Sequence, residues 1–303
     1  MINKIKNLAK SLLPSALSLS IKEIKAIPSI LESIKMDLNS LLVSREIKEK
    51  GLSQKQVLKN SEFKIYSQNG EDGIINYIFS KIDFTNKTFI EFGIENGREC
   101  NTANLSINNG WNGLLIDGDK KSIQEANSYY NNKITLMPNQ VKIMNRFITK
   151  DNINKIFTEA GINGEIDLLS IDIDGNDYWV LEAINAVKPR VIIAEYNAAF
   201  GAERSITIKY DPKFQRYDKD KTGMYFGVSL TALAKLAKTK GYVLIGCEST
   251  GCNAFFVRKD IAKKSKLKEL SVKEAYYPML RRLKKESLKE QLDKIKNFEF
   301  FEI

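Results

Sequence analysis

Between residues 61 and 258 the sequence alternates short apolar runs with longer stretches of helical periodicity, and this alternation restricts the possible folds strongly. The apolar runs have the length of buried strands, and the stretches between them have the length of crossover helices. Strands that alternate with helices form a parallel sheet with helices on both faces. The predicted strands are 88–92, 113–117, 141–148, 166–173, 190–196, 241–247 and 253–258. The predicted helices lie near 71–81, 100–109, 120–131, 151–160, 177–186 and 228–240.

The last two predicted strands are joined differently from the others. Only residues 248–252 separate them, and so short a connection forces an antiparallel hairpin. We therefore expect an α/β domain over 61–258. Its doubly wound, mostly parallel sheet has seven strands and ends in an antiparallel hairpin.

Two basic segments flank this domain. Residues 1–60 contain 11 basic and 5 acidic side chains, and residues 259–303 contain 13 basic and 8 acidic ones. The central segment 61–258 contains 23 basic and 24 acidic side chains. The net charge of +10 therefore belongs to the flanks. We expect a helical extension over 1–60, broken at Pro14 and Pro28, and a basic helical tail over 259–303. Such flanks suit docking to an anionic membrane surface, a partner protein or a second copy; packing on their own domain is the alternative.

Composition excludes several kinds of chemistry. The chain has no His, which excludes a Ser-His-Asp unit and a His-ligated zinc site. Its three Cys show no paired spacing, as is typical of a reducing compartment. No signal peptide is predicted, and no apolar run approaches the ~20 residues of a membrane-spanning helix. We expect a cytoplasmic protein, or one that lies peripherally on the inner face of the membrane.

The first predicted strand runs into a turn that contains glycine. Glu91 stands at the strand end, and Gly93 and Gly97 follow it. Gly93 lets the backbone approach a ligand closely, while the Glu91 carboxylate repels a pyrophosphate and suits an ammonium or a sugar hydroxyl. Asp117 ends the second strand, where doubly wound folds place an acidic side chain for ribose hydroxyls. Together these residues favour a nucleoside site over an ordinary turn and helix cap.

Four side chains with oxygen ligands follow the fourth and fifth strands. Asp172 and Asp174 are two apart in one pair, and Glu195 and Asn197 are two apart in the other. Side chains two apart share a face of a strand, and ligands bind at the carboxyl ends of the strands. We expect all four to converge as ligands for Mg²⁺ or a similar hard cation. The alternatives are a turn and helix cap at Asp174, or binding of a cofactor ammonium or substrate hydroxyls without metal.

Six segments of the chain form a set of motifs: SQNGED (67–72), FIEFGIENG (89–97), LLIDGD (114–119), DLLSIDIDGNDYWV (167–180), EYNA (195–198) and GCESTGCNAFFVR (246–258). They resemble a known family, the FkbM-like class I S-adenosylmethionine-dependent methyltransferases, in a branch found among bacterial surface-polysaccharide enzymes. The resemblance covers about 61–258 and implies a seven-stranded sheet with an antiparallel last strand. It places the methionine part of the cofactor on the turn from Glu91 to Gly97, the ribose on Asp117 and the adenine near 148–152. The predicted cofactor-binding residues are Gln68, Glu91, Gly93, Gly97, Thr102, Asp117, Gly118 and Asp172.

The predicted activity is methyl transfer from S-adenosylmethionine to a hydroxyl of a sugar or polysaccharide precursor. The transfer is an in-line displacement, for which the protein positions donor and acceptor and removes a proton. Without His, we expect a carboxylate, Asp174 or Glu195, or a bound metal to assist that proton removal. The long connection 198–227 is the candidate substrate loop, because it contains the aromatic residues Tyr210, Tyr217, Tyr225 and Phe226. The alternative is that these rings anchor it to the core.

A second hypothesis is a non-catalytic scaffold in a surface-glycan assembly, docked through the basic flanks. A nucleic-acid partner is not expected, because the central segment 61–258 has almost balanced charge. Binding to a phosphate backbone needs a basic track beside the active site.

Overall fold

The computed structural model describes residues 15–133 and 141–303, and its backbone divides into two units, Met1–Arg45 and Glu46–Ile303. The predicted break at Pro14 and the helix before it lie outside the described residues. The division comes earlier than the predicted boundary at residue 60, because α3 (Gln54–Ser61) packs within the larger unit. Its Leu58 is fully buried, and the Gln54 side chain donates a 2.7 Å hydrogen bond to the Ile245 carbonyl.

Within the first unit, the structure describes the helix α2 (Ser15–Ser44). This helix continues through Pro28, so the predicted break there is wrong. A proline removes one backbone hydrogen bond, but the turns on both sides can continue a helix. Several apolar side chains of α2, among them Ile30, Ile34 and Leu41, are about half exposed or more. Within the described ranges, no helix has both the length and the apolar character needed to cross a membrane.

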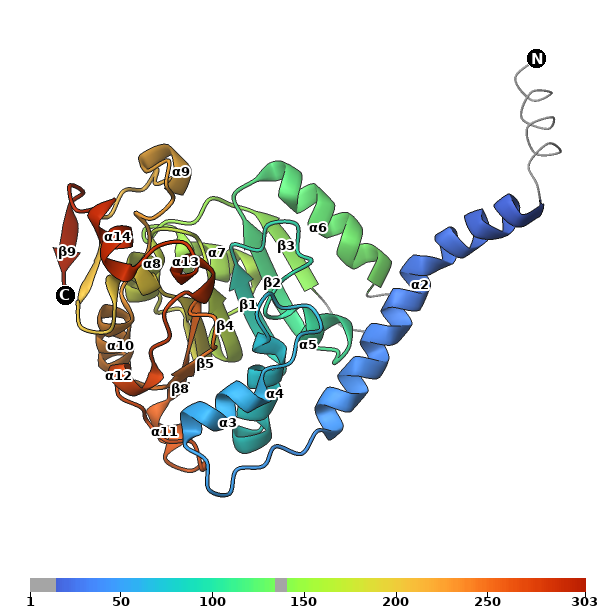
Figure 1. Ribbon diagram of the computed structural model, residues 1–303, viewed down its shortest axis with the longest axis horizontal. Coiled ribbons are helices and arrows are strands. Elements are labelled where there is room, and N and C mark those ends of the chain that lie inside the picture. Colours follow the sequence, from blue (N-terminus) through green and yellow to red (C-terminus); the bar gives the residue numbers. More distant parts are fainter. Residues whose placement is uncertain (1–14, 134–140) are drawn as a thin grey trace, which may run out of the picture. The chain divides into compact units, whose positions relative to one another are not determined.

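The second unit is built on a seven-stranded sheet with the strand order β3-β2-β1-β4-β5-β8-β7 (Figure 1). All neighbouring strands are parallel except β8, which runs antiparallel to β5 and β7. This confirms the predicted fold class and the predicted hairpin. The strands are β1 (Thr88–Phe92), β2 (Asn112–Asp117), β3 (Val141–Asn145), β4 (Gly164–Ile171), β5 (Val187–Glu195), β7 (Tyr242–Cys247) and β8 (Asn253–Arg258).

The helices form because apolar residues at helical spacing find a sheet face to cover. Buried side chains of α7, α8 and α10 share one hydrophobic cluster with Ile90, Phe92 and Leu169 of the strands, so these three helices cover one face. Glu91 and Ser170 alternate with those strand residues and therefore point to the opposite face. The predicted helices correspond to α4 (Glu71–Ile82), α5 (Ala103–Ile107), α6 (Lys120–Lys133), α7 (Ile153–Ala160), α8 (Asp177–Ala183) and α10 (Leu230–Thr239).

Beyond the carboxyl ends of β4 and β5, the long connection and the C-terminal residues build a second layer together. β6 (Ile206–Ile208) pairs antiparallel with β9 (Phe300–Glu302), and the sequence analysis predicted neither strand. Phe226 and Ile295 are both fully buried in the cluster that these parts share. The remaining elements here are η2 (Ala198–Phe200), α9 (Arg216–Lys219), α11 (Lys259–Ala262), α12 (Val272–Ala275), α13 (Leu280–Leu283) and α14 (Leu288–Asp293).

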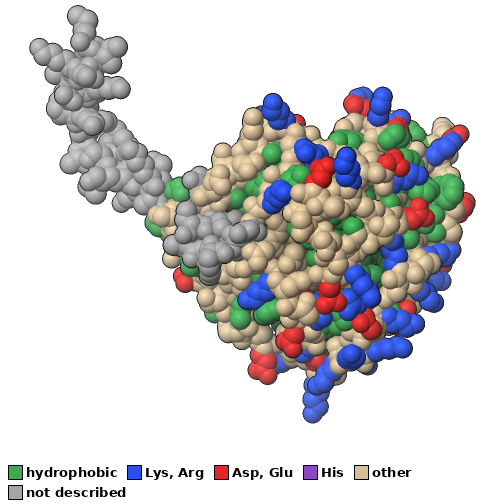
Figure 2. Space-filling model, turned by 180° about the vertical axis from the view of Figure 1, so that it is seen from behind, with side chains coloured by type: hydrophobic (Ala, Val, Ile, Leu, Met, Phe, Trp, Pro, Cys, Tyr) green, Lys and Arg blue, Asp and Glu red, His purple; other side chains and the backbone are tan. Residues whose placement is uncertain are grey.

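This second layer changes the interpretation of the predicted tail 259–303. The Tyr196 hydroxyl, next to the end of β5, donates a 2.7 Å hydrogen bond to the Tyr277 carbonyl. The Tyr276 hydroxyl donates one of the same length to the Ala198 carbonyl. The tail therefore packs on the sheet domain as part of one unit with it. Figure 2, which shows the molecule from behind the view of Figure 1, has Lys and Arg side chains interspersed with Asp and Glu.

Candidate active site

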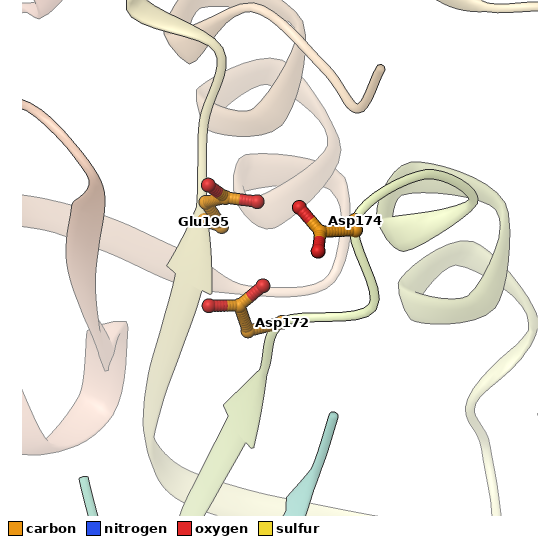
Figure 3. Close-up of side chains that lie close together, drawn as sticks. All are labelled: Asp172, Asp174 and Glu195. Carbon is orange, nitrogen blue, oxygen red and sulfur yellow. The ribbon is translucent and has the colours of Figure 1, made fainter. Parts of the chain in front are cut away.

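Three carboxylates meet at the carboxyl ends of β4 and β5, as predicted from their spacing (Figure 3). Asp172 directly follows β4, Asp174 lies in the turn before α8, and Glu195 is the last residue of β5. One oxygen atom from each side chain lies within 4.8 Å of the others. The three side chains point toward one another, so they can hold one ligand between them. We call these residues the carboxylate cluster.

The turn that carries Asp174 is fixed by a fourth carboxylate. Asp177 accepts hydrogen bonds from the amides of Ile173 and Gly175, both at 2.9 Å. Asp174 itself has a φ of 54°, a left-handed conformation that is uncommon for a residue with a side chain. Asp177 therefore orders the turn, which was the alternative role considered for this segment. The strained backbone of Asp174 directs its carboxylate toward the cluster.

Burial governs the electrostatics of the carboxylate cluster. Burial raises the pKa of Glu195 well above its ordinary value, and the nearby charges of Asp172 and Asp174 raise it further. Burial and the charge of Asp174 do the same to the pKa of Asp172. Glu195 is only 8% exposed, and its buried Oε2 atom has no hydrogen-bond partner in the described part of the chain. A site with this charge and this unpaired oxygen favours a bound proton or cation.

Arg216 of α9 places a positive charge beside the carboxylate cluster, and no sequence motif indicated it. Its guanidinium forms an ion pair with Asp174, and its Nε atom donates a 2.9 Å hydrogen bond to the Gly223 carbonyl. The same guanidinium lies 3.5 Å from the centroid of the Phe226 ring. Arg216 therefore compensates part of the negative charge of the carboxylate cluster.

The Asn197 side chain makes hydrogen bonds with the long connection, and its predicted role as a ligand of a cation stays a prediction. It is fully buried, and its Nδ2 atom donates to the carbonyls of Met224 (2.8 Å) and Phe226 (3.0 Å). Its Oδ1 atom accepts from the amide of Ala199 at 3.1 Å. β5 ends at Glu195, two residues before Asn197. Asn197 anchors the long connection to the sheet.

Glu91 and Thr102 support the site from within the protein. Glu91 is buried and accepts hydrogen bonds from the amides of Asn101 and Thr102, both at 2.9 Å, and from the Thr102 hydroxyl at 2.6 Å. Burial raises the pKa of Glu91, and these hydrogen bonds oppose that effect. Thr102 has no exposed surface. Glu91 and Thr102 thus contact each other and fasten the start of α5. Their predicted contacts with a cofactor stay predictions.

Gly93 brings the ends of β1 and β4 together. Its φ is +80°, and a Cβ atom on it would lie 1.3 Å from the Asp172 carbonyl oxygen. No side chain fits at this position, so the turn after β1 passes directly against the residue after β4. Gly97 also has a positive φ, of +74°. Glycine at both positions keeps the turn compact between the strands where the strand order reverses.

Asp117 lies at the end of β2 and is partly exposed. Its two carboxylate oxygens accept hydrogen bonds from the amides of Glu95 and Asp119, both at 2.8 Å, and each keeps a further lone pair. Gly118 follows it and lies against the ring of Phe147, which is 43% exposed and which the sequence analysis missed. Gln68 is exposed. The predicted ribose residue thus has an exposed aromatic ring near it.

The long connection offers one exposed ring at the site. Tyr225 and Phe226 are buried in the second layer, so these two rings anchor the long connection to the core, as the alternative interpretation predicted. Tyr210 donates a 3.2 Å hydrogen bond to Asp151. Tyr217, next to Arg216, is 62% exposed. Of the four aromatic residues proposed for the substrate loop, Tyr217 is the best placed to contact a ligand from solvent.

No protein-family model matches the sequence, and no curated protein matches it either. Three solved structures illustrate the similarity that is found. An S-adenosylmethionine-dependent methyltransferase from Clostridium acetobutylicum has a TM-score of 0.39 and 12% identity, over 61% of this chain and 89% of that one. Magnesium protoporphyrin IX methyltransferase from Synechocystis, with bound S-adenosylmethionine, has a TM-score of 0.41 and 11% identity, over 70% of this chain and 100% of that one. A putative caffeoyl-CoA O-methyltransferase from Staphylococcus aureus has a TM-score of 0.40 and 14% identity, over 68% of this chain and 93% of that one.

Scores and identities this low leave the activity of the chain to be inferred from its own sheet and site.

Proposed function

We propose that the protein is an S-adenosylmethionine-dependent O-methyltransferase of the FkbM-like type, acting on a hydroxyl of a sugar or polysaccharide precursor. The observation that carries the proposal is the carboxylate cluster at the carboxyl ends of β4 and β5, beside the reversal of strand order between β1 and β4. Ligands of doubly wound sheets bind at such a reversal. The sequence motifs that resemble the family lie around the same edge of the sheet.

The charge of this edge suits the proposed cofactor. Glu91, Asp172 and Glu195 are acidic groups at the ends of three strands that lie side by side. A methyl donor with a sulfonium and an ammonium group carries positive charge, which buried carboxylates stabilise. Asp117 adds a partly exposed carboxylate that can accept hydrogen bonds from ribose hydroxyls.

The carboxylate cluster also supports the proposed proton transfer. An alcohol must lose its proton as it attacks the donor methyl, and a base is most effective when its pKa lies near the working pH. Burial and like charge raise the pKa of Glu195 and of Asp172 toward that range. We propose Glu195 as the base, with Asp174 paired to Arg216 and positioning the acceptor.

The donor set of the carboxylate cluster fits a hard divalent cation. All three ligands are carboxylates, their oxygens lie within 4.8 Å, and the Oε2 atom of Glu195 is unpaired. Mg²⁺ prefers such oxygen ligands. A bound Mg²⁺ would supply Lewis-acid chemistry that lowers the pKa of the acceptor hydroxyl. Asp172, Asp174 and Glu195 would hold it.

A calorimetric titration with S-adenosylmethionine tests the proposal. We expect saturable binding with one site per chain, and we expect Glu195→Gln to keep this binding while losing methyl transfer. Absence of binding by the folded wild-type protein would refute the proposal. That result would favour the scaffold hypothesis instead. The scaffold hypothesis predicts that deletion of residues 1–45 abolishes docking to a membrane or a partner protein. The docking role of that segment and the cytoplasmic location stay predictions.

A further inference from the structure

We propose that Arg216 and Arg282 form a subsite for a negatively charged group of the acceptor, a carboxylate or a phosphate. The acceptor would then be an acidic sugar or a sugar phosphate, with its anionic group beside the hydroxyl that is methylated. This inference rests on the proposed function and adds the class of substrate. We call the two residues the arginine pair.

The arginine pair is assembled around one aromatic ring. The guanidinium of Arg216 lies 3.5 Å from the centroid of the Phe226 ring, and that of Arg282 lies 5.4 Å from it. Phe226 is fully buried, so it fixes the position of both cations. Arg216 comes from the long connection and Arg282 from α13, so segments far apart in the sequence supply the two charges (Figure 1).

The charge of Arg282 is only partly compensated. Its buried Nη1 atom has no hydrogen-bond partner among the residues that the structure describes. Burial and the positive charge of Arg216 lower the pKa of Arg282, and the negative charge of Glu195 opposes this effect only in part. Leaving a buried charged donor unpaired is costly, and buried polar groups are nearly always paired. A negatively charged ligand would pair this donor and relieve the repulsion within the arginine pair.

The backbone around Arg282 is held in place, so its position does not depend on a ligand. The Leu280 amide donates a 3.2 Å hydrogen bond to the Thr250 carbonyl in the β7–β8 hairpin. In the same hairpin, Gly251 packs so closely that a Cβ atom on it would lie 2.6 Å from the Pro278 carbonyl. A preformed position lowers the cost of ordering the site when a ligand binds.

The arginine pair lies beside the carboxylate cluster, and this position indicates which part of the acceptor it would bind. Arg216 pairs with Asp174, so the pair borders the place proposed for the acceptor hydroxyl. An anionic acceptor would be repelled by three carboxylates unless cations lie beside it, and guanidinium groups bind carboxylate and phosphate in a bidentate way. Tyr217, exposed and next to Arg216, can stack on the sugar ring.

Binding of three sugar probes tests the proposal: glucuronate, glucose 6-phosphate and glucose, each titrated in the presence of S-adenosylhomocysteine. We expect one or both anionic probes to bind wild type at least about tenfold more tightly than glucose does. The carboxylate and phosphate probes distinguish the two sources of charge. We expect Arg282→Gln to reduce this preference to about twofold or less. The control Arg281→Gln makes the same charge change at an exposed neighbour in α13 and should keep the preference.

Two results would overturn the proposal. One is that neither anionic probe binds wild type more tightly than glucose. The other is that Arg282→Gln, folded by circular dichroism, keeps the wild-type preference. A repeat of the titrations without S-adenosylhomocysteine separates this proposal from the proposed function. Anion preference that persists in a protein that does not bind S-adenosylmethionine would support the arginine pair and refute the methyltransferase.

Discussion

Replacing Glu195 by Gln is expected to stabilise the fold at the same time as it removes the proposed base. Glu195 is buried, and its carboxylate lies within 4.8 Å of those of Asp172 and Asp174. Two unit charges at 4.8 Å repel each other by about 3.5 kcal/mol at an effective dielectric constant of ~20. Glutamine has nearly the same shape and no charge, so the substitution removes both this repulsion and the burial cost of the charge.

The raised pKa of Glu195 sets the pH dependence of this effect. Between the ordinary pKa of a Glu and the raised one, the folded protein holds a proton that the unfolded chain has already released. The free energy of unfolding of wild type therefore falls as pH rises through this interval. The variant has no such proton, so its advantage grows from near zero at pH ~4 to about 1–3 kcal/mol at pH ~8. For a domain of this size, that corresponds to a rise in Tm of about 2–10 °C.

Thermal unfolding followed by circular dichroism from pH 4 to pH 8 measures the difference. The buffers contain EDTA, so that a divalent cation does not neutralise the carboxylate cluster. Glu125→Gln, an exposed carboxylate on α6, is the matched control and should change Tm little at any pH. If Glu195→Gln is less stable than wild type at pH 8, or if its advantage does not depend on pH, the reasoning about the cluster is refuted.

Four further predictions address other parts of the site. Mg²⁺ should raise the Tm of wild type at pH 8 but not that of Glu195→Gln, and an equal rise in both would contradict the cation site. Asp117→Asn should weaken S-adenosylmethionine binding about tenfold by calorimetry, and an unchanged affinity would exclude the ribose role. Phe147→Ala should weaken the same binding about threefold to tenfold if its ring contacts the adenine. Thr102→Val should lower the free energy of unfolding by about 1–3 kcal/mol in urea titrations, since buried Glu91 loses a donor.

Local pattern predicted the central sheet well, because its strands are continuous apolar runs that the two helix layers bury. It failed for β6 and β9, which have three residues each and too little sequence to show a period. The boundary of the N-terminal extension was also placed too late. α3 is a short, mostly polar helix, and only its packing through Val57 and Leu58 assigns it to the larger unit.

The same limit applies to the site. The convergence of Asp172, Asp174 and Glu195 followed from strand ends and two-residue spacing, both of which are local. The sequence did not predict that the Asn197 side chain donates hydrogen bonds to the Met224 and Phe226 carbonyls, because these residues lie far from it along the chain. Arg216 and Arg282 could not be predicted, because their meeting depends on the burial of a shared ring between segments far apart in sequence.

The pairing of β6 with β9 has a consequence for the order in which the protein is completed. All strands of the seven-stranded sheet have been synthesised once the ribosome has added Arg258. The strand β6 can pair only after its partner β9, which begins at Phe300, has also been synthesised. Closing so long a loop is slow compared with forming local contacts. A nascent chain can thus assemble its sheet and its three acidic groups while the layer that carries Arg216 still lacks one strand. Formation of a complete acceptor site is therefore expected to be a late event in biosynthesis.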